Sequence, residues 1–333
     1  MNDGTIRLVH GNGGQETQKL LDLISENLLR TPFEPDDATA FDVDATRLAM
    51  TTDSFVVDPI FFPGGDIGKL AVCGSVNDLA MVGASPLYLS VGFILEEGFA
   101  LANLKAVCQS MRRTAQEAPV DIVTGDTKVV PKGNVDQIYI NTTALGKIPN
   151  GTHISGNGAK PGDAIILSGP MGLHGAAITA SRSSGMKSQI KSDCRLLNRC
   201  ITQLMEVVGN IHCLRDATRG GVGQALNEVA SQSNVTFEID ETLVPIDESV
   251  MALCEFMGFD PFYLACEGTF LCIVPPEIES QVVGMIQTFH WGKEACSIGR
   301  VAEKQKYPVI LNTPYGGQRI LGMLTGELVP RIC

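Results

Sequence analysis

The chain has 333 residues, of which 44% are hydrophobic and 19% are charged, and its formal net charge is −12. This composition is typical of a globular protein, and the acidic balance argues against a nucleic-acid-binding protein, which would present a basic face. The sequence has no apolar run of about 18 residues, so no membrane-spanning helix is expected. Its first residues lack the basic and apolar regions of a signal peptide.

The ten cysteines lie mostly within apolar segments, where cysteine behaves as a small hydrophobic residue. No two of them have the Cys-x-x-Cys spacing, and the five histidines are scattered along the chain. The sequence therefore argues against a zinc site and favours a reducing, cytoplasmic location.

Residues 8–14 form a glycine-rich loop, Leu-Val-His-Gly-Asn-Gly-Gly, and a helix with leucines at helical spacing follows it. Backbone amides at Gly11, Gly13 and Gly14 could approach an anion closely. The loop matches neither the P-loop nor the Gly-x-Gly-x-x-Gly pattern, so a flexible turn stays an equally open interpretation. His10 alone is better explained as a structural residue.

The first half then alternates strands and helices. We interpret residues 31–46 as a polar connection, and we expect the strand 87–95 to be buried on both faces because it is almost continuously apolar. The other predicted elements are a strand at 47–57 broken by Thr51–Ser54, a helix from Gly64 through Ala80, an amphipathic helix at 100–118 with Leu101, Leu104, Val107, Cys108 and Met111 on one face, and strands at 122–130 and 135–146.

A Gly-, Pro- and Asn-rich stretch at 149–162 marks a boundary, after which the alternation starts again. The predicted elements are strands at 163–168, 211–218, 235–239, 263–274 (interrupted at 266–269), 296–302 and 307–311, and helices at 173–185, 193–208, 222–231, 247–257 and 277–289. The sequence therefore predicts an α+β protein with an N-terminal domain at 1–148, a C-terminal domain at 149–312 and a flexible tail at 313–333.

Four aspartates, Asp53, Asp78, Asp126 and Asp216, each lie beside an apolar segment and next to a small or polar residue. Aspartate is disfavoured in strands and unfavourable to bury alone. Mg²⁺ prefers a few carboxylates together with phosphate oxygens, so the repeated pattern predicts a shared magnesium-nucleotide site. The alternative is that each aspartate only caps a helix or begins a turn.

Lys69 and Lys128 are the cations nearest to these aspartates in sequence, and either could hold a phosphate. Lys69 could equally be a solvated surface residue. Glu267 lies among apolar residues, where a carboxylate with a raised pKa could serve as a base. A salt-bridged or edge-strand glutamate is the alternative.

The last residue is Cys333, and the residues before it contain little that would anchor them in a core. The last 11 residues could reach at most roughly 36–40 Å if extended, enough for this thiol to visit a site elsewhere on the surface. We therefore expect Cys333 to be the group on which an ATP-using enzyme acts. An incidental free thiol is the other interpretation.

Together these motifs resemble one family over essentially the whole chain. The sequence is similar to the HypE carbamoyl dehydratases of [NiFe]-hydrogenase maturation, within the AIR-synthetase-related (PurM-like) ATP-binding proteins. The matching segments are His10–Gln15, Ser54–Gly65, Ile67–Ala71, Asn77-Asp78, Gly92–Glu97, Gly125–Val130, Leu214–Gly221 and Pro330–Cys333.

The resemblance implies a two-domain PurM-like fold and a homodimer in which the N-terminal sheets pair and ATP binds near the interface. It also implies that a carbamoyltransferase, HypF, loads the thiol of Cys333. Mg-ATP then activates the carboxamide oxygen, loss of phosphate leaves a thiocyanate, and the cyanide passes to iron held by HypC and HypD.

The resemblance further assigns roles to residues. Proton transfer falls to Glu267 and Lys128. The nucleotide positions are Gly11, Gly13, Gly14, Asp53, Lys69, Asn77 and Asp126, and the metal positions are Asp53, Asp78, Asp126 and Asp216.

One departure concerns Glu267, because the family pattern leads us to expect Asn before it and Lys two residues after it, where this chain has Cys266 and Thr269. Two rival functions remain. One is another ATP enzyme of this fold, either a thiamine-monophosphate kinase or a selenophosphate synthetase, although the latter needs a reactive residue near the N-terminus and no cysteine precedes Cys73. The other is a carrier that only displays a thiol.

Overall fold

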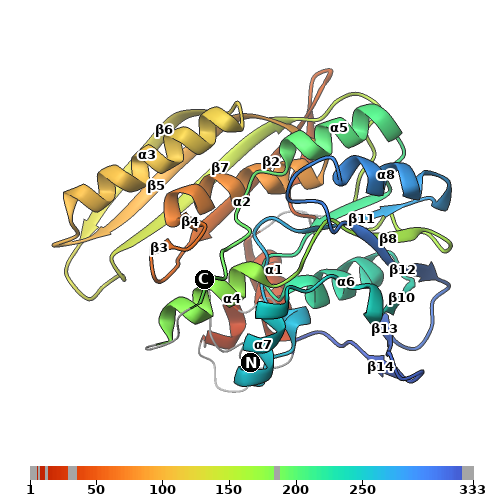
Figure 1. The fold of residues 1–333 in the computed structure, drawn as a ribbon. Coiled ribbons are helices and arrows are strands. Elements are labelled where there is room, and N and C mark those ends of the chain that lie inside the picture. The colour runs from red at the N-terminus through yellow and green to blue at the C-terminus, as the bar shows by residue number, and fades with distance from the viewer. Residues whose placement is uncertain (1–5, 7, 12–13, 29–35, 184–187, 325–333) are drawn as a thin grey trace.

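The computed structural model describes residues 6, 8–11, 14–28, 36–183 and 188–324. Figure 1 shows two halves side by side, each built on a β-sheet; helices cover one face of the first sheet and both faces of the second. A short 3₁₀ helix, Leu8–Gly11, and helix α1, Gln15–Leu28, precede the first sheet.

The first sheet has five strands in the order β1-β2-β7-β5-β6. Only the β5–β6 pair is parallel. The strands are β1 (Thr39–Val43), β2 (Thr46–Phe55), β5 (Ser85–Glu96), β6 (Asp121–Val130) and β7 (Ile138–Lys147), the helices of this half are α2 (Ile67–Met81) and α3 (Leu101–Glu117), and a small hairpin is formed by β3 (Phe61–Phe62) and β4 (Gly65–Asp66).

Two predictions about the start of this sheet are wrong. Strand β1 lies within the segment that we interpreted as a connection, where it pairs antiparallel with β2. Strand β2 is not broken at Thr51–Ser54, because alternate residues face opposite sides of a strand, so Thr51 and Asp53 point toward α2 while Thr52 and Ser54 face the other way. The polar residues on the α2 side therefore occur without interrupting the ladder.

Helix α2 begins where the sequence predicts. The Asp66 carboxylate accepts hydrogen bonds from the backbone N–H groups of Gly68 and Lys69, at 2.8 and 3.1 Å, and thereby caps the helix. Almost every later residue of α2 is buried, because the helix packs on the first sheet on one side and against elements of the second half on the other. This helix therefore connects the two hydrophobic cores.

The far edge of the first sheet is more exposed than we predicted. Strand β5 is not buried on both faces, since Tyr88 is 48% exposed, and every residue of β6 except the last is exposed. On α3, Val107 and Met111 face the core as expected, but Leu101 is 82% exposed and Cys108 is also exposed. A large part of this sheet is therefore left uncovered by the part of the chain that the structure describes.

The second sheet has seven strands in the order β14-β13-β10-β12-β8-β11-β9. Its strands are β8 (Ala164–Leu167), β9 (Cys213–Asp216), β10 (Thr236–Asp240), β11 (Phe270–Val274), β12 (Cys296–Ala302), β13 (Val309–Asn312) and β14 (Gln318–Ile320). The helices are α4 (Leu173–Arg182), α5 (Asn198–Val208), α6 (Gly221–Gln232), α7 (Glu248–Met257) and α8 (Glu279–Ile286), with 3₁₀ turns at Glu241–Leu243, Pro261–Tyr263 and Pro276–Ile278.

We predicted that the residues just before Phe270 form the first part of a strand, and this prediction is wrong. Residues 266–269 form a turn, and β11 begins only after it. The turn places Glu267 at the end of β11 beside β9, the strand that ends at Asp216.

The beginning of the predicted tail is also anchored. Strand β14 pairs antiparallel with β13, and Leu321 is buried in the second core. The Arg319 guanidinium forms ion pairs with Glu241 and Asp260, at 2.7 and 3.1 Å. The expectation of a free tail from residue 313 is therefore wrong as far as residue 324.

Within the described ranges, no helix is long and apolar enough to cross a membrane.

Candidate functional site

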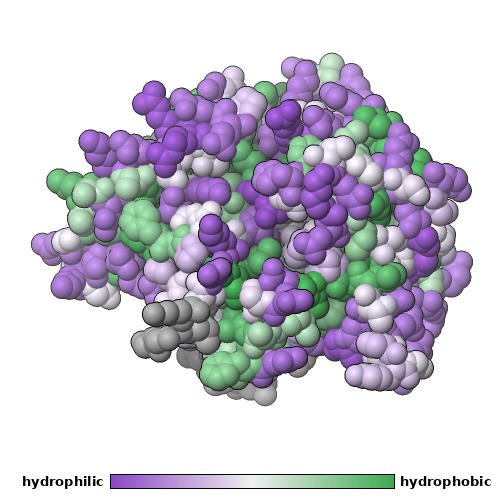
Figure 2. All heavy atoms as spheres, viewed as in Figure 1, coloured by the Kyte–Doolittle hydropathy of each residue, from purple (hydrophilic) through white to green (hydrophobic). Residues whose placement is uncertain are grey.

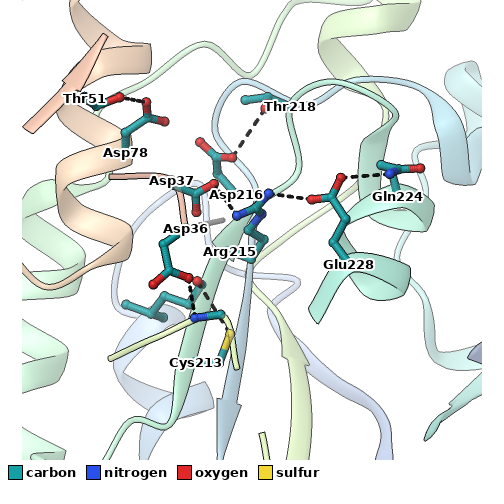
Figure 3. A network of polar contacts seen from close by, with 12 residues as sticks. Asp36, Asp37, Thr51, Asp78, Cys213, Arg215, Asp216, Thr218, Gln224 and Glu228 are labelled. Atoms are coloured by element: carbon teal, nitrogen blue, oxygen red, sulfur yellow. Dashed lines mark hydrogen bonds and ion pairs between the residues drawn. The ribbon is translucent and has the colours of Figure 1, made fainter. Parts of the chain in front are cut away.

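Four aspartates from four separate parts of the chain come together where the two halves meet. We call them the acid cluster: Asp37 in the segment before β1, Asp53 on β2, Asp78 on α2, and Asp216 at the end of β9. Figure 3 shows Asp78 and Asp216 facing one another across the junction, with Asp37 close to Asp216. The sequence predicted three of these four residues.

The carboxyl groups of the acid cluster are all difficult to ionise. Burial raises the pKa of each one, and for Asp78 the charges of Asp53, Asp216 and Asp37 raise it further. Burial raises the pKa of Asp216 to about 6, and the guanidinium of Arg215 opposes the shift. Like charges that are held close together in a buried place favour a bound cation.

Asp37 could not be predicted from the sequence, because it lies in a polar segment without helical or strand periodicity. Its carboxylate is 2.9 Å from the guanidinium of Arg215, which also forms an ion pair with Glu228 (Figure 3). The Glu228 carboxylate accepts a second hydrogen bond from the side chain of Gln224, at 2.8 Å. A chain of polar contacts thus joins the acid cluster to helix α6.

Asp216 provides a direct test of whether the cluster suits a divalent cation. Its residue is 7% exposed, and its Oδ2 atom is buried without a hydrogen-bond partner in the described structure. Thr51 donates a 2.7 Å hydrogen bond to one oxygen of the Asp78 carboxylate, which lies next to Asp53. No group of three His, Cys, Asp or Glu side chains in the described ranges is already arranged as a metal site. The donor types fit Mg²⁺, which would neutralise the unpaired oxygen and draw the carboxylates together.

Arg219 is a second residue that the sequence analysis did not single out. It lies in the Thr218–Gly221 turn before α6, it is exposed, and its charge lowers the pKa of both Asp53 and Asp216. Gly220 and Gly221 have φ angles of 76° and 62°, a region that favours glycine, and this lets the chain turn sharply into the helix. The turn thus holds one exposed cation beside the buried carboxylates.

Asn77 was predicted to contact the nucleotide, but the structure gives it a different position. It is 3% exposed, its Nδ2 donates to the carbonyl of Arg195 at 3.0 Å, and its Oδ1 accepts from the N–H of Leu197 at 2.9 Å. The side chain therefore connects α2 to the segment that leads into α5, and this placement does not support a role as a nucleotide ligand.

Lys69 lies in the first turn of α2 and is partly exposed. Its ammonium donates a 3.0 Å hydrogen bond to the carbonyl of Gly64, and its charge acts on the nearby thiol of Cys194. The same thiol lies close enough to Glu267 to affect that carboxyl group. Lys69 and Glu267 therefore both lie near Cys194.

Glu267 occupies the turn before β11, and its side chain is partly accessible. Burial raises the pKa of this carboxyl well above its usual value, and the nearby carboxyl groups of Asp216, Asp193 and Asp53 add to the shift. A carboxylate with a raised pKa is a stronger base than an ordinary one, as acid–base catalysis near neutral pH requires. In this respect the structure agrees with the expectation from the sequence.

Asp126 and Lys128 do not join the acid cluster within one chain. They lie on the edge strand β6, where they form an exposed ion pair of 2.9 Å, and this partner lowers the pKa of Asp126. The strand register aligns Asp126 with Ser54 rather than with Asp53, so it faces the opposite side of the sheet. Three strand spacings of about 4.8 Å also separate β6 from β2. Within one chain the structure therefore brings three of the four predicted aspartates together and leaves Asp126 apart from them.

The glycine-rich loop is next to the anchored end of the tail. A side chain at Gly14 would come within 2.3 Å of the carbonyl oxygen of Leu324, so glycine is needed for the close approach. The N–H of Leu324 donates to the side chain of Gln224, and the Tyr263 hydroxyl donates to the carbonyl of Gly322. Gly11 ends the first 3₁₀ helix. Gly13 and Cys333 lie outside the described residues.

Family models match both halves of the chain. Residues 35–148 match the N-terminal domain of AIR synthase related proteins, and residues 160–312 match the C-terminal domain.

Individual proteins match over nearly the full length. A carbamoyl dehydratase HypE of Azotobacter vinelandii is 44% identical over 336 residues, which cover 100% of this chain and 98% of that protein. A crystal structure of a HypE–HypF complex superposes with a TM-score of 0.86 at 42% identity and covers 92% of this chain and 99% of the other. A HypE structure in complex with ATP superposes with a TM-score of 0.83 at 45% identity, covering 99% and 100% of the two chains.

Proposed function

The chain belongs to the HypE family of carbamoyl dehydratases, within the AIR synthase related proteins, and we propose that it makes a thiocyanate on its own Cys333 at the expense of ATP. The observation that carries the proposal is the acid cluster at the junction of the two halves, with the unpaired Oδ2 of Asp216 in it. Such a site suits a magnesium nucleotide, and the chain contains a thiol that a tail can carry to it.

The proposed reaction starts from Cys333 carrying an S-carbamoyl group. The carbamoyl oxygen attacks the γ-phosphorus of ATP, and ADP leaves. The C–O bond then breaks with phosphate as the leaving group, the two N–H protons are lost, and the nitrogen electrons complete the C≡N bond. Phosphorylation is needed because oxide is a very poor leaving group from an amide, whereas phosphate is a good one.

Glu267 is the proposed base for the N–H protons, since its pKa is raised and it lies beside the acid cluster. Lys69 and the loop that contains Gly11, Gly13 and Gly14 are proposed to bind phosphate oxygens. Arg219 is a further candidate for the same task because it is exposed beside Asp53 and Asp216.

Asp53, Asp78 and Asp216 are the proposed ligands of Mg²⁺. When bound, the cation would neutralise phosphate charge that develops during transfer of the phosphoryl group. Asp37 does not need to touch the metal, because its ion pair with Arg215 already partly neutralises it.

We propose a homodimer that forms through the uncovered face and edge of the first sheet. Strand β6 has ten residues and no partner on its outer edge in the described structure, and Met50, Tyr88 and Ile94 are exposed on the face opposite α2. Figure 2 shows apolar side chains at the left end of the view, the region in which Figure 1 places β5, β6 and α3. A second copy would cover this edge, and its Asp126 and Lys128 could then complete the site of the neighbouring subunit.

The anchored part of the tail sets the distance that Cys333 can travel. Cys333 is nine residues beyond Leu324, a segment that spans at most roughly 30–32 Å when extended. Leu324 lies beside Gln224, which the polar chain through Glu228 and Arg215 links to the acid cluster. The proposed path of the tail therefore begins close to the site that it must enter.

The proposed partners follow from the same chemistry. A carbamoyltransferase of the HypF type would load the thiol, and an iron-carrying HypC–HypD complex would accept the cyanide. We also propose a cytoplasmic location, because all nine cysteines in the described residues are free thiols.

The deciding experiment is the intact mass of the chain after incubation with the carbamoyltransferase and carbamoyl donor, before and after addition of Mg-ATP. We expect a carbamoyl adduct that loses the mass of one water when ATP is added. Cys333→Ala should abolish both changes, whereas Cys108→Ala, which removes an exposed cysteine of the described chain, should leave both unchanged.

An adduct that stays intact with ATP would support a thiol carrier instead. No adduct with a competent partner, together with phosphorylation of a small acceptor by the Cys333→Ala variant, would support a small-molecule kinase.

A further inference from the structure

The residues between α4 and α5 include a buried segment without regular secondary structure, 192–197. Its backbone is nevertheless fixed at several points. The amide of Asn77 on α2 bonds to the backbone of Arg195 and Leu197, and the Ser192 hydroxyl accepts from the N–H of Cys194 at 3.0 Å. A buried segment held in this way can act as a rigid support for whatever packs against it.

The group that packs against it is the turn that carries Glu267. The Asp193 side chain is 1% exposed, its Oδ1 accepts from the N–H of Glu267, and its Oδ2 accepts from the N–H of Gly268, both at 3.0 Å. Hydrogen bonds to an ionised acceptor are stronger than neutral ones. The Asp193 carboxylate therefore binds the backbone N–H groups of both Glu267 and Gly268.

Arg195 holds the carbonyl side of the same turn. Its backbone N–H donates to the carbonyl of Glu267 and its guanidinium donates to the carbonyl of Gly268, each at 3.3 Å. The guanidinium also lies 5.2 Å from the centre of the Trp291 ring, which limits its movement. The peptide groups on both sides of Glu267 are therefore fixed by residues of one segment.

The close approach explains why glycine follows Glu267. A side chain at Gly268 would come within 2.0 Å of the backbone oxygen of Asp193, a distance that no side chain can tolerate. The residues on either side bond elsewhere: the Cys266 thiol accepts from the N–H of Gly172, and the Thr269 hydroxyl donates to the carbonyl of Pro170. Neither neighbour therefore orients the carboxyl group of Glu267.

We propose that Asp193 is the positioning residue of Glu267, holding the 266–268 turn so that the Glu267 carboxyl group faces the acid cluster. This inference rests on the proposed role of Glu267 as a base. It also accounts for the departure from the family pattern at Cys266 and Thr269, because the backbone clamp from Asp193 orients Glu267 without help from either side chain.

The test compares Asp193→Asn with the wild-type chain, using the rate at which the carbamoylated tail loses water. An asparagine amide nitrogen cannot accept a hydrogen bond, so one of the two N–H groups loses its partner. We expect kcat to fall roughly 10- to 100-fold, the effect typical of residues that orient a site from behind, while KM for ATP stays unchanged.

Asp163→Asn is the matched control. Asp163 is also a buried aspartate that accepts from a backbone N–H, that of Lys160 at 2.8 Å, but it belongs to another turn of the C-terminal half. We expect Asp163→Asn to keep the wild-type kcat even if it lowers the melting temperature.

A double-mutant cycle separates positioning from a general loss of stability. In a Glu267→Gln background, Asp193→Asn should add little further loss, because the residue that it positions is already inactive. The proposal would be overturned if the kcat losses of Asp193→Asn and Glu267→Gln multiplied in the double variant, or if Asp193→Asn alone left kcat unchanged. If Asp193→Asn does not fold, Arg195→Ala removes the guanidinium hydrogen bond to the Gly268 carbonyl on the other side of the same turn and should also lower kcat.

Amide hydrogen exchange distinguishes failure of this inference from failure of the proposed function. Exchange at Glu267 and Gly268 should accelerate in Asp193→Asn whether or not the protein dehydrates its tail. If the wild-type chain never loses water, the proposed function is wrong. If it does lose water but exchange at these two amides is unchanged in the variant, the clamp is wrong.

Discussion

Asp216 and Asp126 are both aspartates beside apolar strand residues, yet the fold treats them in opposite ways. Asp216 is buried among other carboxylates, and burial raises its pKa to about 6. Asp126 is exposed on an edge strand, where the hydrogen bond from Lys128 lowers its pKa. The same residue type is therefore buried with a raised pKa in one place, and exposed with a lowered pKa and a lysine partner in the other.

The comparison indicates that the two regions have different roles. The acid cluster is complete within one chain and suits a cation, whereas the Asp126–Lys128 pair lies on an uncovered sheet edge that suits a second copy. Three measurements would test whether the two regions have these different roles.

The largest expected effect comes from the acid cluster itself. We expect Asp78→Asn to lower the ATP-dependent dehydration rate by at least about two orders of magnitude, because a proposed magnesium ligand is lost. The melting temperature of the metal-free variant should rise, because one of several mutually repelling carboxylates is gone. Rate measurements and thermal melts would check both effects. Asp42→Asn, an exposed aspartate on β1, should change neither. Full activity in Asp78→Asn would show that the Asp78 carboxylate is not a magnesium ligand in this site.

The second effect tests whether Asp126 acts in the neighbouring subunit. Asp126→Asn and Asp78→Asn should each be inactive alone, with Asp126→Asn keeping the wild-type melting temperature because its carboxylate is exposed. When the two variants are mixed and allowed to exchange subunits, each mixed dimer should contain one intact site. Activity should then recover to about a quarter of the wild-type value for a two-fold dimer with shared sites. No recovery despite subunit exchange would place Asp126 in its own chain's site or outside it.

The smallest effect is the pH dependence of stability in metal-free protein. Between about pH 4 and 6 the folded chain binds more protons than the unfolded chain, because the pKa of Asp216 is raised from 3.8 to about 6 on folding. The unfolding free energy should therefore decrease as pH rises through this window, and the melting temperature should fall by a few degrees. Melts with EDTA at several pH values would measure the slope. Asp216→Asn should flatten it, and so should excess Mg²⁺; a slope of the opposite sign would contradict the raised pKa.

Much of the fold was predictable because local signals and tertiary packing agree. The Gly64-Gly65-Asp66 sequence predicted the start of α2, and Asp66 indeed caps it. The predictions failed where local patterns conflict with packing. The Thr51–Ser54 patch looked like a break, but in a strand only alternate residues face α2, so polar side chains can line a site without ending the ladder.

The site was predictable in part. Asp53, Asp78, Asp216 and Glu267 carry local signals, because charged residues are unusual beside apolar segments. Asp37 and Asp193 carry none, since each lies in an irregular segment whose partners are far away in the sequence. For Asn77, the motif Asn-Asp cannot reveal which of the two side chains points into the site, and in the fold its amide bonds to the backbone of Arg195 and Leu197.

By itself the sequence determined the family, the α+β class and the types of residue available for chemistry, because glycine turns, apolar periodicity and isolated charges are local properties of the chain. Only the tertiary structure decided which charges meet. Distances between Asp37, Asp78 and Asp216, the separation of Asp126 from them, and the clamp of Asp193 on the Glu267 turn all depend on long-range packing. The pKa of a carboxyl group follows its neighbours and its burial, and neither can be read from adjacent residues.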